Sequence, residues 1–275
     1  MQAFITYLTA VWIALLSFFG VQGANNPITF IVFGDSGTGS EAQIKLAGVM
    51  EQYPVDLILH TGDIAYDAGT EEELQKNFFD VYAPILKKTP FYPAPGNHDY
   101  VTDNLGPYLT RFAKNKYYSF DTPAVHFISL DVVGSIEEEM IGWLEEDLKL
   151  AQGKRWVVVY FHYPPFSSGS THGGNKAVRE QLVPLLDKYG VNFVFSGHEH
   201  QYERMKPINN VTYIITGGGG ASLYDFGELA ETSLVHAKEY HFVYMDATKC
   251  GMTGKAINID NNVIDSFTLS RCRAE

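Results

Sequence analysis

The chain has 275 residues, of which 45% are hydrophobic, and a formal net charge of -12 at pH 7. This length is enough for one domain with a large core. An acidic surface repels nucleic-acid backbones and anionic lipids, which excludes both as general partners. An anionic substrate would therefore need a strong local centre of positive charge.

The amino-terminal segment has the pattern of a secretory signal. Met1–Gly20 is nearly continuous apolar sequence. The apolar core of the segment is Val11–Val21, and the small residues Gly23 and Ala24 follow shortly after it. We predict a signal peptide over residues 1–23, followed by a single domain over residues 24–275. An uncleaved anchor is the alternative. Cleavage would leave a secreted or lumenal protein, periplasmic in a bacterium, without stable membrane insertion.

The first half of the domain alternates short apolar runs with amphipathic segments. The predicted strands are Pro27–Phe33, Val55–Leu59 and Phe91–Pro95,. The predicted helices are Glu41–Gln52 and Glu71–Leu86. The second helix has an acidic first turn and a basic end, which suits the helix dipole.

The second half continues the alternation and then becomes mostly β. Paired strands are predicted at Tyr117–Phe120 and Val125–Leu130, and further strands at Arg155–Phe161 and Val191–Phe195,. A helix is expected over Ile136–Leu150. A second helix is expected over Asn175–Tyr189, with a kink at Pro184. Four short β segments follow, near Val211–Ile215, Tyr240–Asp246, Lys255–Ile259 and Val263–Leu269.

Five of the predicted strands end in loops that carry Asp, Asn, His or Tyr. Alternating strands and helices predict a mostly parallel sheet with helices outside. Ligands bind beyond the carboxyl ends of the strands in such sheets, so these loops are expected to converge. The converging candidates are Asp35, Asp63, Tyr66, Asn97, His98, His162, His198 and His200.

All of these except His98 are predicted to hold two metal ions. Oxygen donors combined with imidazoles suit iron, zinc or manganese better than calcium. Two ions would activate a shared water and supply the positive charge that an acidic protein lacks. We assign Asp35, Tyr66 and His200 to one ion, Asn97, His162 and His198 to the other, and Asp63 as the bridge. The remaining histidines His60, His126, His236 and His241 are interpreted as ordinary structural residues.

The five loops resemble, in order, the motifs of the purple acid phosphatases, which belong to the calcineurin-like metallophosphoesterases. The matching segments are Gly34-Asp35-Ser36-Gly37, Gly62-Asp63-Ile64-Ala65-Tyr66, Gly96-Asn97-His98-Asp99, Val159-Tyr160-Phe161-His162 and Gly197-His198-Glu199-His200. The resemblance implies an α/β fold, a four-layer α/β/β/α sandwich of two mixed sheets flanked by helices. It also implies Fe(III) bound by the Tyr66 phenolate, with zinc, iron or manganese as the second ion. The chain looks like a small form without the extra amino-terminal β-domain that some members carry.

The function expected from this resemblance is hydrolysis of small phosphate monoesters by a metal-bound hydroxide, in a secreted acid phosphatase. His98 and His172 would hydrogen-bond the phosphoryl oxygens, and one of them would protonate the leaving group. For His172, an exposed loop residue without a catalytic role is the alternative. A phosphodiesterase or nucleotidase and a non-catalytic metal-binding member are the alternative functions. The glycines from Gly34 to Gly39 lack the dinucleotide-binding spacing, which argues against a nucleotide-cofactor enzyme.

Two further patterns fit a secreted chain. Cys250 and Cys272 are the two cysteines and are expected to pair with each other,. Asn210-Val211-Thr212 is a sequon for N-glycosylation, which would be used only in a eukaryotic secretory pathway,.

Overall fold

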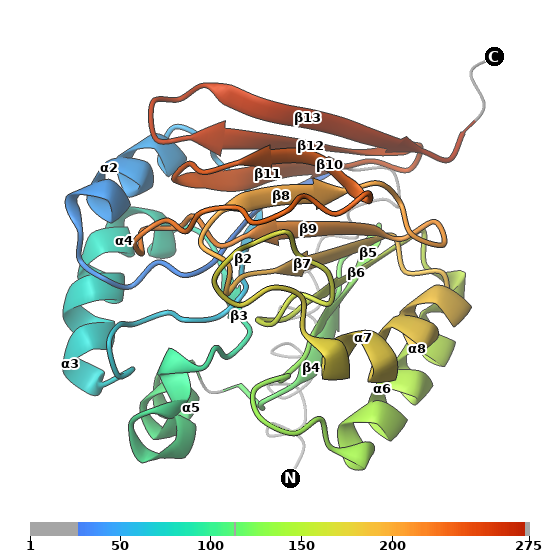
Figure 1. Cartoon of the computed structure of the whole chain (residues 1–275), viewed down its shortest axis with the longest axis horizontal. Coiled ribbons are helices and arrows are strands. Elements are labelled where there is room, and N and C mark those ends of the chain that lie inside the picture. The colour runs from blue at the N-terminus through green and yellow to red at the C-terminus, as the bar shows by residue number, and fades with distance from the viewer. Residues whose placement is uncertain (1–26, 113, 273–275) are drawn as a thin grey trace, which may run out of the picture.

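The protein is described here by a computed structural model, which covers residues 27–112 and 114–272. Two β-sheets pack face to face, and helices cover the outer face of each sheet (Figure 1). The predicted signal peptide, residues 1–23, lies outside the described residues. Within them, no helix combines the length and the apolar character that crossing a bilayer requires.

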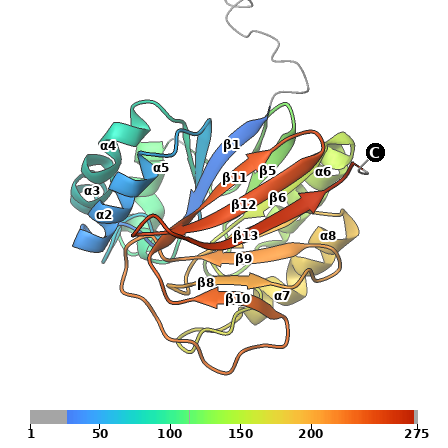
Figure 2. The same ribbon diagram turned by 90° about the horizontal axis from the view of Figure 1, so that it is seen from above.

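The first sheet has six strands in the order β13-β12-β11-β1-β2-β3. Strands β1, β2 and β3 run parallel, whereas β11, β12 and β13 form antiparallel pairs beside β1. Figure 2 shows β11, β12 and β13 side by side above the second sheet. The bounds are β1 Ile28–Phe33, β2 Leu57–His60, β3 Phe91–Pro93, β11 His241–Ala247, β12 Gly251–Asn258 and β13 Val263–Ser270.

The second sheet has seven strands in the order β10-β8-β9-β7-β6-β5-β4, and its β9, β7, β6 and β5 are parallel. The parallel strands expected from the alternating pattern are present but are divided between two sheets, and antiparallel strands extend each sheet. The two-sheet α/β sandwich implied by the resemblance is confirmed. The bounds are β4 Tyr118–Asp121, β5 Val125–Ser129, β6 Trp156–Tyr160, β7 Phe193–Ser196, β8 Tyr202–Met205, β9 Thr212–Thr216 and β10 Ser233–Ala237.

Helices on the two outer faces complete the four layers. The helix predicted over 71–86 begins with a capping box at Thr70 and contains a π-helical stretch, η1. The helix predicted over 175–189 is broken at Leu182, next to Pro184. The bounds are α2 Glu41–Met50, α3 Glu71–Glu73, η1 Leu74–Phe79, α4 Asp80–Leu86, α5 Gly106–Phe112, α6 Glu138–Leu150, α7 Lys176–Gln181 and α8 Val183–Lys188, with 3-10 turns η2 His98–Tyr100, η3 Asp103–Leu105 and η4 Ala151–Gly153.

Three apolar clusters hold these layers together. The central cluster joins the facing sides of the two sheets, through pairs such as Phe30 and Phe127. A second cluster packs α6, α7 and α8 on one sheet, and a third packs α2, α4 and α5 on the other. Cys250 and Cys272 form the expected disulfide, which joins the start of β12 to the end of β13. The rigid sandwich therefore presents the loops that follow its parallel strands as one fixed surface.

Candidate metal centre

Each predicted ligand lies in a loop directly after a strand of the sandwich. Asp35 follows β1, Asp63 and Tyr66 follow β2, and Asn97 follows β3. From the second sheet, His162 follows β6, and His198 and His200 follow β7. Both aspartates are buried, with exposed fractions of 0% and 1%. The edge where these strands end thus gathers donors from segments far apart in the sequence.

One group of donor atoms surrounds the hydroxyl of Tyr66. Its oxygen lies 3.2 Å from Asp35 Oδ1, 3.0 Å from Asp63 Oδ2 and 3.1 Å from His200 Nε2. The second nitrogen of the His200 ring, Nδ1, donates to the Ser222 carbonyl at 2.8 Å, which fixes the orientation of the ring. These four side chains are the ones that the sequence assigned to the first ion and the bridge.

A second group of donor atoms surrounds His162. Its Nε2 lies 3.0 Å from Asn97 Oδ1 and 3.3 Å from Asp63 Oδ2, while its Nδ1 donates to the Thr61 carbonyl. The ring of His198 lies against the ring of His162, with centroids 4.9 Å apart. Asp35, Asp63 and His162 each offer an atom within 4.8 Å of the others. Asp63 therefore belongs to both groups.

Burial and nearby charges shift the pKa values of four side chains in the cluster. Burial alone would raise the pKa of Asp63, but the charge and hydrogen bond of His162 hold it well below its usual value. Burial opposes protonation of His162, yet Asp63 raises its pKa to about 9. Burial and the neighbouring His162 lower the pKa of His198 to about 2. Burial, followed by the charges of Asp63 and Asp35, raises the pKa of the Tyr66 phenol.

This donor set fits metal ions. Among the described residues, the ion pairs of Asp35 and Asp63 are formed with histidines alone, so no Lys or Arg balances these buried carboxylates. Buried carboxylates require a proton, a cationic side chain or a metal. Binding of a metal displaces protons from exactly such imidazole and carboxylate donors. Asp35, Tyr66 and His200 could hold one ion, Asn97, His162 and His198 a second, and Asp63 both.

The two histidines predicted to contact substrate pack on different proposed ligands of this cluster. His98 packs its ring 4.4 Å from the Tyr66 ring, and its Nδ1 donates to the Asp67 carbonyl at 2.7 Å. That bond leaves Nε2 of His98 available. His172 is exposed, and its ring stacks on the His198 ring with centroids 4.1 Å apart.

The histidines interpreted as structural lie in ordinary surroundings. His60 is buried and bonds Ser36 Oγ at 2.9 Å. His126 lies between two aspartates, and buried His241 donates to the backbone of Glu239. His236 is exposed and packs on the Phe226 ring.

Three residues near the centre were not assigned a role from the sequence. Asp99 is buried and accepts the backbone N–H groups of Asp63, Ile64 and Gly96, which ties two of the ligand loops together. Tyr224 stacks its ring on His200 with centroids 4.1 Å apart. Glu199 is buried between His198 and His200. The sequence signal that could have found Asp99 and Glu199 is their position, because both are carboxylates inside ligand motifs.

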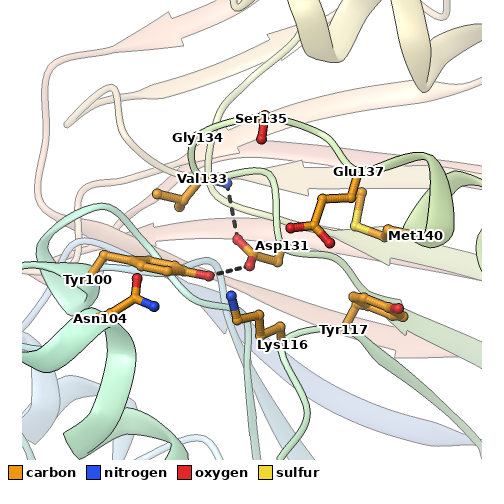
Figure 3. Close-up of a pocket in the computed structure, with 10 residues that line it drawn as sticks. All are labelled: Tyr100, Asn104, Lys116, Tyr117, Asp131, Val133, Gly134, Ser135, Glu137 and Met140. Atoms are coloured by element: carbon orange, nitrogen blue, oxygen red, sulfur yellow. Dashed lines mark hydrogen bonds between the residues drawn. The ribbon is translucent and has the colours of Figure 1, made fainter.

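A cavity of about 290 Å³ lies beside the η2 turn that begins at His98 (Figure 3). Tyr100, the last residue of this turn, donates its hydroxyl proton to Asp131, which also accepts the N–H of Val133 at 3.1 Å. Lys116 faces the same cavity, with its ammonium 5.3 Å from the Tyr100 ring centroid. The residues that line this cavity include neither His98 nor a proposed metal ligand, so it is a separate polar pocket.

Comparison with known proteins places this geometry in a family. The family model described as calcineurin-like phosphoesterase matches residues 28–202. Purple acid phosphatase 22 of Arabidopsis thaliana is 32% identical over 204 residues, which cover 67% of this chain and 46% of that protein. The chain spans about half the length of the curated relatives it matches first, which are purple acid phosphatases.

Two solved structures share the fold. A purple acid phosphatase from yellow lupin seeds superposes with a TM-score of 0.78 and 24% identity, over 90% of this chain and 54% of that one. GAP50, described as the anchor in the inner membrane complex of Plasmodium, superposes with a TM-score of 0.80 and 21% identity, over 90% of each chain. Since the family model also covers more than half of the sequence, this chain belongs to the calcineurin-like phosphoesterase family.

Proposed function

We propose that this protein is an acid phosphatase that hydrolyses small phosphate monoesters at a dinuclear metal centre. The observation that carries the proposal is the position of Asp63. Its Oδ2 lies 3.0 Å from the Tyr66 hydroxyl and 3.3 Å from His162 Nε2, so one carboxylate can bridge two ions. Resemblance to purple acid phosphatases supports the same function.

The ions would be Fe(III), held by Asp35, Tyr66 and His200, and a divalent zinc, iron or manganese ion, held by Asn97, His162 and His198. A phenol and two carboxylates are hard donors that favour a trivalent ion, whereas imidazoles suit a divalent one. When bound, the pair supplies positive charge for the phosphate and activates water. This local positive charge would allow a chain whose net charge is -12 to bind an anionic substrate.

The side chains of the site would bind and protonate the substrate. His98 donates its Nδ1 proton to the Asp67 carbonyl, so a hydrogen bond from Nε2 to a phosphoryl oxygen would need a second proton on the ring,. The ring of His172 stacks on the ring of His198. One of the two would donate the proton that the leaving alkoxide needs.

A pH–rate profile of the metal-loaded protein tests the proposal. An aromatic phosphate monoester and the diester with the same leaving group are compared in parallel. We expect faster turnover of the monoester, with an acidic optimum. Diester preference would favour a phosphodiesterase or nucleotidase on the same centre. No turnover of either ester with metals bound would overturn the proposal in favour of a non-catalytic member.

His172→Ala tests the role of His172 within this mechanism. The variant should lose turnover of an alkyl phosphate, whose leaving group needs a proton, by about 100-fold or more. Turnover of an aryl phosphate with a good leaving group should fall much less. Equal loss for both substrates would contradict the assignment of His172 as a proton donor.

Secretion is proposed as part of the same function, by cleavage of the signal at residues 1–23. Asn210, the acceptor of the sequon, is exposed at the turn between Ile208 and Val211, where a glycan would fit. Small phosphorylated compounds are the proposed substrates, with no nucleic acid. Amino-terminal sequencing of the exported protein should begin near Ala24, and retention of Met1 on a membrane-bound product would contradict the cleavage.

A further inference from the structure

The loop that carries His172 is anchored by two buried carboxylates. At its tip, the backbone N–H of His172 donates to Glu199 Oε1 at 2.7 Å, and the N–H of Gly173 donates to the same oxygen. At its start, the N–H of Ser168 donates to Glu203 Oε2 at 2.8 Å. Both glutamates have an exposed fraction of 0%.

Glu199 is also fixed on the side of the metal centre. It stands between His198 and His200 in the loop after β7. The backbone N–H of His198 donates to both oxygens of Asp35, at 3.1 and 3.0 Å, and His200 Nε2 lies 3.1 Å from the Tyr66 hydroxyl. Any movement of the Glu199 backbone would therefore disturb ligands of both proposed ions.

The loop packs directly on the Glu199 carboxylate. A Cβ atom at Gly169 would lie 2.3 Å from the carboxyl carbon of Glu199, so any side chain there would displace the carboxylate. The start of the loop is tied to a further segment, because the N–H of Ser170 donates to the Asp225 carbonyl and that of Gly227 to the Ser168 carbonyl. The loop thus has a defined course, although its histidine is exposed.

The His172 ring packs on two other rings. It stacks on the His198 ring, with centroids 4.1 Å apart and planes at 29°, and lies edge-on to the Tyr224 ring, with centroids 5.6 Å apart. Among the described residues, the hydrogen bond of His172 is made by its backbone, and its ring makes none. The position of the ring therefore depends on the backbone anchor at Glu199 together with these two ring contacts.

We propose that Glu199 is a positioning residue that holds His172 against the phosphate site. Because Glu199 lies in the same loop as His198 and His200, that loop would determine the position of His172. This inference rests on the function proposed above for His172. A purely structural Glu199 would stabilise the protein without any specific dependence on His172.

Kinetics of the metal-loaded protein separate these two roles. Glu199→Ala should reduce kcat for an alkyl phosphate about 100-fold, since small misplacement of a catalytic group costs that much. In a protein that already carries His172→Ala, adding Glu199→Ala should have little further effect on kcat. Glu199→Gln keeps one acceptor oxygen and should recover most of the loss. Gly169→Ala keeps Glu199 but displaces its carboxylate, and should behave like Glu199→Ala.

Hydrogen exchange of the peptide over residues 167–174 provides a readout that does not depend on activity. In Glu199→Ala the amides of His172 and Gly173 should exchange faster, while protection in β6 and β7 stays unchanged. Asp265→Asn is the matched control, because Asp265 is a partly buried residue whose carboxylate pairs with Arg204 and does not bond this loop. It should lower stability without altering exchange of the loop or the dependence on His172.

The outcomes are distinct. Slow exchange of the loop in Glu199→Ala, or an equal loss of kcat in the presence and absence of the His172 side chain, would overturn the positioning role. If the unmutated protein hydrolyses no phosphate ester, the proposed function fails, and the exchange experiment still tests the anchor. Fast exchange together with non-additive kinetics supports both proposals.

Discussion

His241 is expected to make the protein less stable in acid. Its side chain has an exposed fraction of 0% at the start of β11. Nδ1 donates to the Glu239 carbonyl at 2.8 Å, and Nε2 has no partner among the described residues. Burial lowers the pKa of His241 from 6.5 to about 4, because the imidazolium would lose its hydration there,.

The sign of the effect follows from this lowered pKa. The unfolded chain binds the proton more tightly than the folded protein, so the contribution of neutral His241 is fully present above pH 6.5. It is lost as the pH falls from 6.5 to about 4,. At pH 4.5 the free energy of unfolding should be lower than at pH 7 by about 2 kcal/mol from this residue alone.

Urea unfolding at pH 7 and pH 4.5 tests this value in the unmutated protein and in His241→Asn. The side-chain nitrogen of Asn can take the place of Nδ1 and donate to Glu239, but Asn does not titrate. The variant should be less stable at pH 7, because it fills less of the site. On acidification it should lose about 2 kcal/mol less than the unmutated protein. Equal losses in both proteins would refute the reasoning.

Three further predictions concern the disulfide, a second histidine and the proposed iron ligand. Replacing both Cys250 and Cys272 by Ser opens a loop with a sequence separation of 22, and should cost about 3 kcal/mol,; an unchanged urea midpoint would contradict this. Burial lowers the pKa of His126, but its hydrogen bonds to Asp147 and Asp121 raise it more. Its contribution is therefore present below pH 6.5 and lost as the pH rises, and Tm between pH 6 and 9 should fall less in His126→Gln. Tyr66→Phe should abolish the visible band of the iron-loaded protein and leave some hydrolysis; a retained band would contradict ligation of iron by Tyr66.

Most strands could be predicted because an apolar run ends at a glycine or a charged residue. The strands that were missed, β8 and β10, lack that pattern. β8 contains Glu203 and Arg204, which are tolerated in the sheet because Glu203 bonds a loop and Arg204 pairs with Asp265. β10 lies at the edge of its sheet and is only half covered. Long-range partners of this kind leave no local signal in the sequence.

The residue types of the centre could be predicted, but the residues that support them could not. Asp99 lies in the same motif as Asn97, yet its role depends on backbone N–H groups 35 and 36 residues earlier. Glu199 likewise acts on His172, 27 residues before it. A motif shows which side chains are available. Their contacts depend on how the loops of different strands meet.

The backbone conformation of three proposed ligands is a further feature that the sequence does not predict. Asp35, Asp63 and His198 have φ values of +59°, +57° and +68°, in the left-handed region that most side chains avoid,. Each such residue costs about 1–3 kcal/mol unless its surroundings stabilise it. The N–H of Asp63 donates to Asp99, and that of His198 donates to Asp35, so contacts between separate loops hold both conformations. A glycine would adopt these angles freely but would supply no donor atom. The chain therefore keeps Asp and His at strained positions, and the direction in which they point depends on contacts between loops that follow different strands.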